Sequence, residues 1–325
     1  MIALIAAAAA FVIAALAGKP LIGLLNRKKL GRSGIVYKDG AFHPGQEVAP
    51  EFGGALLLIG LVPAALIGMI VHLFTVEAGR GFVFGKTITL LIGCVLMAVI
   101  GMIDDRQRAI GQKTMPLLLR CGLIWCGGLA FLMTLRIMGG YSELILIPFT
   151  GGQSRLGGIW MLWLILGAAL GSDRLQTVSG EAASVSLVQL LTFAGVSAVF
   201  GSRVETIVGF GAAGAVLGLL LFAFPPEKLR EGSGGRILMG TLPYMGAILG
   251  GTPLFILPTA FPFIFEAIYG MIRVAVLKAG KKTLPDTFGG WLMEKGMSGK
   301  AVSGLMTGLA AVGGVIAIGA AYLYL

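Results

Sequence analysis

Long apolar runs separated by short polar loops dominate this chain from end to end. A helix needs about 20 apolar residues to cross the roughly 30 Å hydrocarbon core of a bilayer. Ten runs cross or nearly cross such a core, although several are short, and they predict an all-α polytopic membrane protein with about ten transmembrane helices. These runs cover residues 2–25, 52–74, 84–103, 116–138, 159–172, 185–200, 207–224, 237–249, 254–277 and 302–325.

The segment 143–156 interrupts this helical pattern. An apolar stretch ends at Pro148 and Phe149, Gly151 and Gly152 follow as a turn, and a short return stretch completes the segment. Such a pattern is typical of a small β-hairpin. The rest of the chain shows neither a soluble domain nor an internal repeat, so we expect one integral membrane domain over residues 1–325.

Composition strengthens the membrane interpretation. Of the 325 residues, 57% are hydrophobic and 12% are charged, and the mean hydropathy is +0.93, which is far above that of a soluble domain. The 52 glycines favour close helix packing in lipid. The net charge of +10 lies in short loops rather than along one soluble face, which favours anionic lipid or phosphate over nucleic acid as the partner.

The loop charges predict the orientation of the chain in its membrane. Basic residues gather in alternate loops, which the positive-inside rule makes cytoplasmic. An even number of spans then places both termini outside, and the apolar N-terminal run, which has no basic leader, is expected to be a first span rather than a signal peptide. The residues that define the cytoplasmic side are Arg27, Lys28, Lys29, Arg32, Lys38, Arg106, Arg108, Lys113, Arg174, Lys228, Arg230, Arg236, Arg273, Lys278, Lys281, Lys282, Lys295 and Lys300.

Cysteine and histidine contribute little candidate chemistry. Cys94, Cys121 and Cys126 lie inside apolar runs, where a free thiol packs as a small hydrophobe, so we expect no disulfide and no cysteine metal site. His43 and His72 fall on opposite sides of the membrane in this topology and cannot form a joint site.

Asp104 and Asp105 end the third predicted span at its cytoplasmic surface. Ionised carboxylates at an interface can bind Mg²⁺ or accept a proton from a phosphate nucleophile. We therefore select both as candidate catalytic residues and metal ligands. The alternative is an acidic helix end beside Arg106 and Arg108.

Two glycine-rich helix starts are candidate phosphate sites, because glycines can leave backbone N–H groups free at a helix N-terminus. One follows the double proline of the loop between Phe224 and Arg236, and the other begins the second span. Each has a plain structural alternative, a basic turn in the first case and a close-packing point in the second. The candidate substrate-binding residues here are Lys228, Gly232, Ser233, Gly234, Gly53 and Gly54.

Taken in order, these segments resemble the polyprenyl-phosphate N-acetylhexosamine-1-phosphate transferase superfamily (glycosyltransferase family 4), and most closely its phospho-N-acetylmuramoyl-pentapeptide-transferase branch. DGAFHPGQEVAPEFGGALL from Asp39 is similar to the first cytoplasmic loop of that family, and GMIDDR carries its acidic pair. ILIPFTGGQSRLGG resembles its periplasmic hairpin, LLLFAFPPEKLREGSGGRILMG its fourth cytoplasmic loop, and FEAIYGMIRVAVLKAGKK its ninth span with Glu266 in place.

The resemblance implies a fold of ten spans, a polyprenyl phosphate acceptor, a UDP-sugar donor, Mg²⁺ in the active enzyme, and a homodimer or a heterodimer with an active paralogue. It also adds His43 of the first loop to the candidate substrate-binding residues.

Several positions depart from the family pattern. In GAALGSDRLQTVSGEAAS, Leu170 and Asp173 stand where the family has asparagines, and Gln176 and Ser179 where it has acids. Ser233 replaces the acid that holds Mg²⁺, and Gly289, Gly290 and Trp291 stand in place of a histidine cluster.

These departures leave three readings of the function open. The first is a pseudoenzyme that acts as a membrane binding, regulatory or assembly partner, because phosphoryl transfer needs the lost cation clamp. The second is an active Mg²⁺-dependent transferase with a rebuilt metal site, in which Asp173, Glu231 or Asp286 helps the acidic pair. The third is a transporter or flippase, which predicts buried polar residues within the spans. Only Arg120 and Glu266 qualify, and we expect Arg120 to reach the interface and Glu266 to serve the scaffold.

The convergence of the acids separates the first two readings. If Asp173 or Glu231 lies within about 5 Å of Asp104 or Asp105, one metal ion can bridge them. On this basis we expect Asp105→Asn to change folding little and to remove any Mg²⁺-dependent substrate binding.

Overall fold

The computed structural model describes residues 1–28, 30, 49–75, 80–138, 143–155, 157–224, 226–278 and 284–325. His43, Asp39 and the rest of the first predicted loop motif up to Val48 lie outside these residues, as do Lys281 and Lys282.

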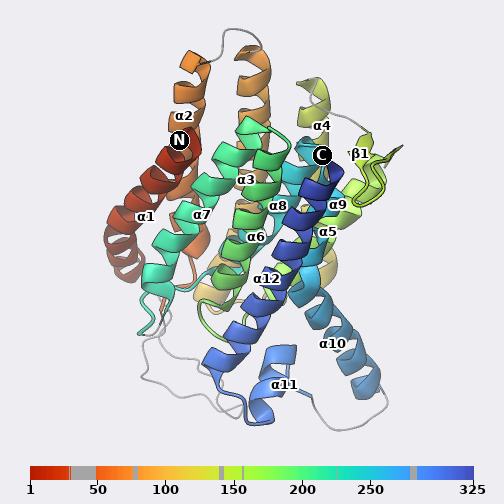
Figure 1. Cartoon of the computed structure of the whole chain (residues 1–325). Coiled ribbons are helices and arrows are strands. Elements are labelled where there is room, and N and C mark those ends of the chain that lie inside the picture. Colours follow the sequence, from red (N-terminus) through yellow and green to blue (C-terminus); the bar gives the residue numbers. More distant parts are fainter. Residues whose placement is uncertain are drawn as a thin grey trace.

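The described residues form an α-helical bundle with one small sheet (Figure 1). This arrangement confirms the predicted all-α polytopic fold class, and the helices largely follow the apolar runs. The elements are α1 (Ile2–Arg27), α2 (Gly53–Thr75), α3 (Arg80–Ala109), α4 (Leu117–Ile137), β1 (Leu144–Leu146), β2 (Gln153–Arg155), α5 (Gly158–Arg174), α6 (Glu181–Val199), α7 (Arg203–Ala223), α8 (Gly232–Leu249), α9 (Pro253–Ile256), the 3₁₀ helix η1 (Leu257–Ala260), α10 (Phe261–Lys278), α11 (Phe288–Glu294) and α12 (Gly299–Tyr324).

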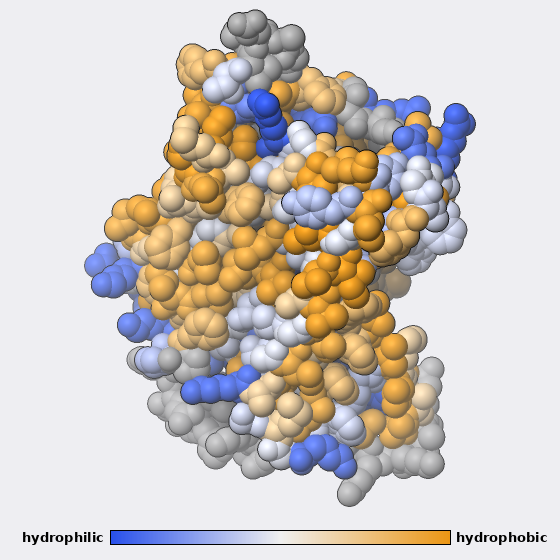
Figure 2. All heavy atoms as spheres, viewed as in Figure 1, coloured by the Kyte–Doolittle hydropathy of each residue, from blue (hydrophilic) through white to orange (hydrophobic). Residues whose placement is uncertain are grey.

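Eight segments within the described residues are long and apolar enough to cross a membrane. Seven are the long helices α1, α2, α3, α4, α6, α7 and α12, and the eighth runs from Pro253 to Leu277 through α9, η1 and α10. The remaining two predicted spans form the helices α5 and α8, which are not among the eight. Hydrophobic residues cover the middle of the face shown in Figure 2, and most hydrophilic ones lie towards its two ends. The chain is therefore a multi-pass membrane protein.

The predicted hairpin forms as an antiparallel pair in which Ile145 stands opposite Ser154. Its turn places Phe149 and Gly151 at positive φ, and the side chain of Ile145 is buried. The backbone N–H of Leu146 also donates to the carbonyl of Gly251 at 3.0 Å, which attaches the hairpin to the segment after α8. The hairpin lies towards the same end of the bundle as both termini, and α11 lies at the other end (Figure 1).

Helix α8 is the centre of the bundle, because all 18 of its residues are buried. It packs against α2, α3, α5 and α6. Large apolar side chains on the peripheral helices are exposed instead, as expected for surfaces that face lipid. Examples are Leu16, Leu118, Ile137, Val315 and Leu323.

Glycines allow α2 and α3 to approach the start of α8 at backbone distance. A Cβ atom on Gly101 of α3 would lie 2.5 Å from backbone atoms of Gly234, and one on Gly54 of α2 would lie 2.7 Å from backbone atoms of Gly234 and Gly235. Both distances are shorter than any Cβ contact that a folded protein tolerates. This packing brings the acidic end of α3 against the first turn of α8.

Candidate functional site

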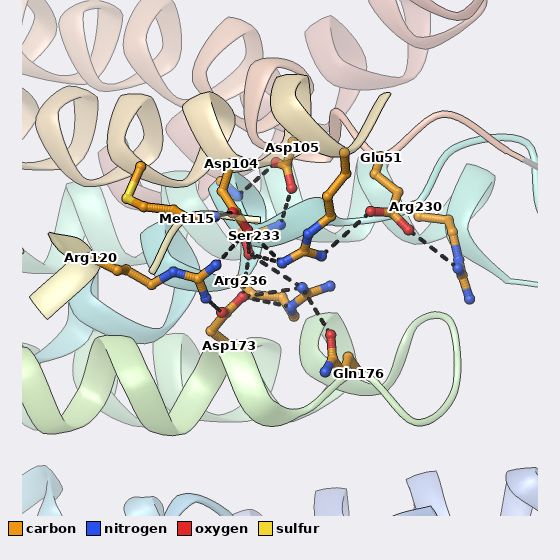
Figure 3. A network of polar contacts seen from close by, with 12 residues as sticks. Glu51, Asp104, Asp105, Met115, Arg120, Asp173, Gln176, Arg230, Ser233 and Arg236 are labelled. Atoms are coloured by element: carbon orange, nitrogen blue, oxygen red, sulfur yellow. Dashed lines mark hydrogen bonds and ion pairs between the residues drawn. The ribbon is translucent and has the colours of Figure 1, made fainter. Parts of the chain in front are cut away.

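Acidic and basic side chains from four helices meet around the N-terminus of α8 (Figure 3). Asp104 and Asp105 come from the end of α3 and Asp173 from the end of α5, while Ser233 belongs to the first turn of α8. The three acids and Ser233 are all buried. The arginines that reach them are Arg108 of α3, Arg120 of α4 and Arg236 of α8. We call these seven residues the acid–arginine cluster.

Asp104 is held by two arginines and one backbone donor. Its Oδ2 atom accepts from the guanidinium groups of Arg108, one helical turn ahead, and Arg120. Its Oδ1 atom accepts the backbone N–H of Met115 at 2.7 Å. Arg108 also reaches Glu51, with 3.6 Å between Nη1 and Oε2. Asp104 is thus fully hydrogen-bonded within the chain.

Asp173 shares two of its partners with Asp104. Its Oδ2 atom accepts from Arg120, the same guanidinium that binds Asp104. Its Oδ1 atom accepts from Ser233 Oγ at 2.6 Å and from Arg236 Nε at 3.2 Å. Ser233 Oγ also lies 3.4 Å from Asp104 Oδ2. Arg120 therefore lies between the carboxylates of Asp104 and Asp173, and Ser233 contacts both of them.

Asp105 caps the N-terminus of α8. Its Oδ1 atom accepts the backbone N–H of Ser233 at 2.6 Å, and its Oδ2 atom accepts that of Gly234 at 2.9 Å. Gly232 adopts φ +65°, and a Cβ atom there would lie 2.5 Å from Asp105 Oδ2. A carboxylate at a helix N-terminus is favoured by the free N–H groups and the helix dipole. The N–H groups predicted to cradle phosphate thus bind a carboxylate of the chain itself.

Gly53 and Gly54 lie at the contact between the starts of α2 and α8. The backbone N–H of Gly53 donates to the carbonyl of Arg230 at 2.9 Å, and that of Arg230 donates to the carbonyl of Pro50 at 2.9 Å. A Cβ atom on Gly53 would lie 2.7 Å from Cα of Glu231. These contacts agree with the close-packing alternative for this glycine pair.

Lys228 and Glu231 lie apart from the cluster's contacts. Lys228 is exposed and lines a pocket of about 450 Å³ with Phe11 and Phe224. Glu231 is buried, and its Oε1 atom has no hydrogen-bond partner among the described residues. Burial raises the pKa of Glu231, an effect that the nearby Arg236 opposes.

Gly289, Gly290 and Trp291 lie in α11, a short helix that the sequence pattern did not predict. Thr287 caps it by accepting the N–H of Gly290 at 3.0 Å. Glu266 of α10 accepts the N–H groups of Phe288 and Gly289 at 3.1 and 3.3 Å. Glu266 therefore fixes the position of α11, in agreement with the scaffold role expected for it.

The cluster does not fit Mg²⁺ as a ligand set. All six oxygen atoms of Asp104, Asp105 and Asp173 already accept hydrogen bonds from guanidinium, hydroxyl or backbone N–H groups. The three guanidiniums pair with Asp104 and Asp173, so these two carboxylates are neutralised without a metal ion. Within the described residues, no three or more Asp, Glu, His or Cys side chains are grouped so that they could hold a metal.

Sequence reasoning found the acids of this site and missed its three arginine partners as site residues. Arg108 follows Asp104 by four residues on one helix, a spacing that predicts an ion pair. Arg120 and Arg236 are brought to the acids by packing between helices, and Arg120 was expected at the membrane interface instead. Their signal is weaker, a basic residue inside or beside an apolar run.

No protein-family model matches the chain. Curated relatives named phospho-N-acetylmuramoyl-pentapeptide-transferase match it over most of its length. That of Desulforamulus reducens is 24% identical over 84% of this chain and 81% of the relative. That of Geobacillus thermodenitrificans is 25% identical over 86% of each, and that of Moorella thermoacetica is 26% identical over 82% of this chain and 81% of the relative. These matches confirm the resemblance that the motifs predicted.

Proposed function

We propose that this chain, a homologue of the phospho-N-acetylmuramoyl-pentapeptide-transferases over most of its length, is a pseudoenzyme of the bacterial inner membrane. In this proposal it keeps the scaffold of a phospho-sugar transferase and acts in cell-envelope synthesis as a binding, regulatory or assembly partner. The charged loops face the cytoplasm, both termini face outward, and residues 1–325 act as one membrane domain.

One observation carries the proposal: the carboxylates that would bind a metal are satisfied by arginines and backbone donors of the chain itself. Phosphoryl transfer depends on cations that neutralise the transferred group. Removing a single well-placed electrostatic group typically costs about 2.7–4 kcal/mol in the barrier. A carboxylate already bound to two guanidiniums is a poor ligand for Mg²⁺, which demands near-ideal octahedral geometry.

The ligands that we assign to this pseudoenzyme follow from its homology. We propose a polyprenyl phosphate lipid as its membrane ligand and a UDP-sugar as a second ligand. In this interpretation Asp104 and Asp105, the candidate catalytic pair, have a structural role. Lys228 and His43, the latter outside the described residues, remain candidates for contact with phosphate. A homodimer, or a heterodimer with an active paralogue, is the assembly that the family suggests.

The experiment is a transfer assay with purified protein, a radiolabelled UDP-linked amino sugar and undecaprenyl phosphate, run with Mg²⁺ and with EDTA. A homologous transferase purified in the same detergent is the positive control, and the Asp104→Asn variant is the negative control. We expect no turnover from this chain under either condition, together with retained binding of undecaprenyl phosphate. Metal-dependent turnover that disappears in Asp104→Asn contradicts the proposal and identifies an active, divergent transferase.

A further inference from the structure

Arg120 occupies the position between two converging carboxylates. Its guanidinium donates through Nη2 to Asp104 Oδ2 and through Nη1 to Asp173 Oδ2, so one cation joins α3 to α5 from the first turn of α4. Figure 3 shows this group between the two acids, with Ser233 beside them. A planar guanidinium can bind two carboxylates at once in this way.

We infer that Arg120 is a built-in cation that takes the place of a divalent metal ion between Asp104 and Asp173, and that removing its side chain opens a divalent-cation site there. The inference rests on the proposed function in one respect, namely that the acid–arginine cluster of the native chain binds no metal ion. The inference adds to that function a metal site that the Arg120 side chain occupies in the native chain.

The oxygen atoms that Arg120 leaves behind are suitable ligands. Without it, Asp173 Oδ2 loses its guanidinium partner, and Asp104 Oδ2 keeps Arg108 and the longer contact from Ser233. Ser233 Oγ lies 2.6 Å from Asp173 Oδ1 and 3.4 Å from Asp104 Oδ2, so a third oxygen lies nearby. Mg²⁺ and Mn²⁺ prefer oxygen ligands, and Mg²⁺ is commonly held by one or two carboxylates with water completing its shell.

The other two arginines are held by contacts of their own. Arg108 reaches Asp104, Ser233 and Glu51, and Arg236 reaches Asp173 and Gln176. Neither can bridge Asp104 and Asp173 as Arg120 does without giving up some of these contacts. Loss of Arg120 therefore removes one positive charge from between Asp104 and Asp173, which makes the space between them more attractive to a cation.

The Arg120 side chain is more accessible to solvent than the acid that it binds. It is 13% exposed, whereas Asp104 is 1% exposed. Because part of this side chain reaches solvent, we expect its truncation to let a small hydrated cation reach the acids.

The experiment is a Mn²⁺ titration followed by electron paramagnetic resonance on four proteins: the native chain, Arg120→Ala, Arg120→Lys and Arg106→Ala. Arg106 is exposed and lies on α3 beside the acidic pair, so its removal matches the change in net charge without opening the site. We expect Arg120→Ala to bind one Mn²⁺ with an affinity at least about tenfold above that of the native chain. The lysine variant retains a cation, and it and Arg106→Ala should resemble the native chain.

Two results overturn the inference. One is an Arg120→Ala protein that binds Mn²⁺ no better than Arg106→Ala. The other is a native chain that already binds one Mn²⁺ in a manner lost in Asp104→Asn. Transfer activity of the native chain in EDTA would instead contradict the proposed function. It would not contradict the inference that Arg120 is the cation between the two acids. The two failures are therefore distinguishable.

Arg120→Ala can also fail to fold without metal, because it removes one of the cations that neutralise two buried carboxylates. In that case Arg120→Ala/Asp173→Asn, which removes the excess charge, is compared with Arg120→Ala by thermal denaturation with and without Mn²⁺. We expect Mn²⁺ to stabilise only the single variant. Equal stabilisation of both proteins, or of neither, counts against the inference.

Discussion

The carboxylate of Asp105 on α3 accepts the backbone N–H of Ser233 on α8 at 2.6 Å, so an acid of one helix caps the N-terminus of another. The neighbouring Gly234 N–H completes this cap at 2.9 Å. Because α8 is the buried centre of the bundle, this contact fixes the helix around which the acid–arginine cluster is built.

We expect Asp105→Asn to destabilise the protein. The amide keeps one acceptor oxygen but places an NH₂ group against a backbone donor, so one buried donor is left without a partner, at a cost of about 1–3 kcal/mol. Thermal denaturation in detergent measures the change. The control is Asp286→Asn, whose side chain is 79% exposed and pairs with Arg273 at the surface, where a pair contributes little.

This expectation reverses the one drawn from sequence, in which Asp105→Asn changed folding little. The sequence places Asp105 at an interface, where an acid can face water. The structure places it on the backbone of α8, a relationship that no local pattern encodes because the two segments are far apart in the chain. Equal unfolding midpoints for Asp105→Asn and Asp286→Asn would restore the earlier expectation.

We expect Gly101→Ala to destabilise the protein by about 1–3 kcal/mol, since overpacking moves backbone that is already in contact. The added methyl group would lie 2.5 Å from backbone atoms of Gly234. Gly122→Ala on α4 is the matched control, because a Cβ atom there has no neighbour within 4 Å. The difference between the two unfolding midpoints checks this prediction, and equal midpoints would show that α3 and α8 are farther apart than described.

We expect Glu231→Gln to stabilise the protein increasingly as the pH rises above 4.5, the ordinary pKa of a glutamate side chain. Burial raises the pKa of Glu231 above its ordinary value near 4.5, so the folded chain keeps a proton that the unfolded chain releases. The native chain therefore has its full stability at a pH below that ordinary value. It loses stability as the pH rises through the pKa that Glu231 has in the folded state. Glutamine does not ionise, so the Glu231→Gln variant does not lose stability in this way as the pH rises.

Thermal denaturation of the native chain and Glu231→Gln across this pH range is the measurement. Glu227→Gln, a change to a partly exposed residue of the same loop that pairs with Arg230, is the control. A stability difference between the native chain and Glu231→Gln that stays constant with pH contradicts this account of Glu231.

Sequence reasoning predicted the fold better than the site. Helices in a membrane need long apolar runs, so the runs show where most of them lie. The exception is α11, seven residues long, which depends on Thr287 and on Glu266 from another helix. Likewise α3 continues to Ala109 beyond its apolar run, helped by the pairing of Asp104 with Arg108 one turn later.

At the site, Asp104 and Asp105 could be selected from the sequence because they are charged residues at the end of an apolar run. Their partners depend on tertiary packing: Arg120 lies 53 residues from Asp173 in the sequence, and Arg236 lies 63 residues from it. The sequence therefore indicated the acids, but only the three-dimensional structure shows which arginines pair with them.

The central claim is that the carboxylates of Asp104 and Asp173 have their cation within the chain. The most direct test is the unfolding midpoint of the native protein titrated with Mg²⁺ at constant ionic strength, beside EDTA and a homologous transferase. A ligand that binds only the folded state stabilises it by about 2.7 kcal/mol at a hundredfold excess over its Kd. We expect no saturating shift for this chain, whereas a saturating Mg²⁺ shift that disappears in Asp104→Asn would contradict the account.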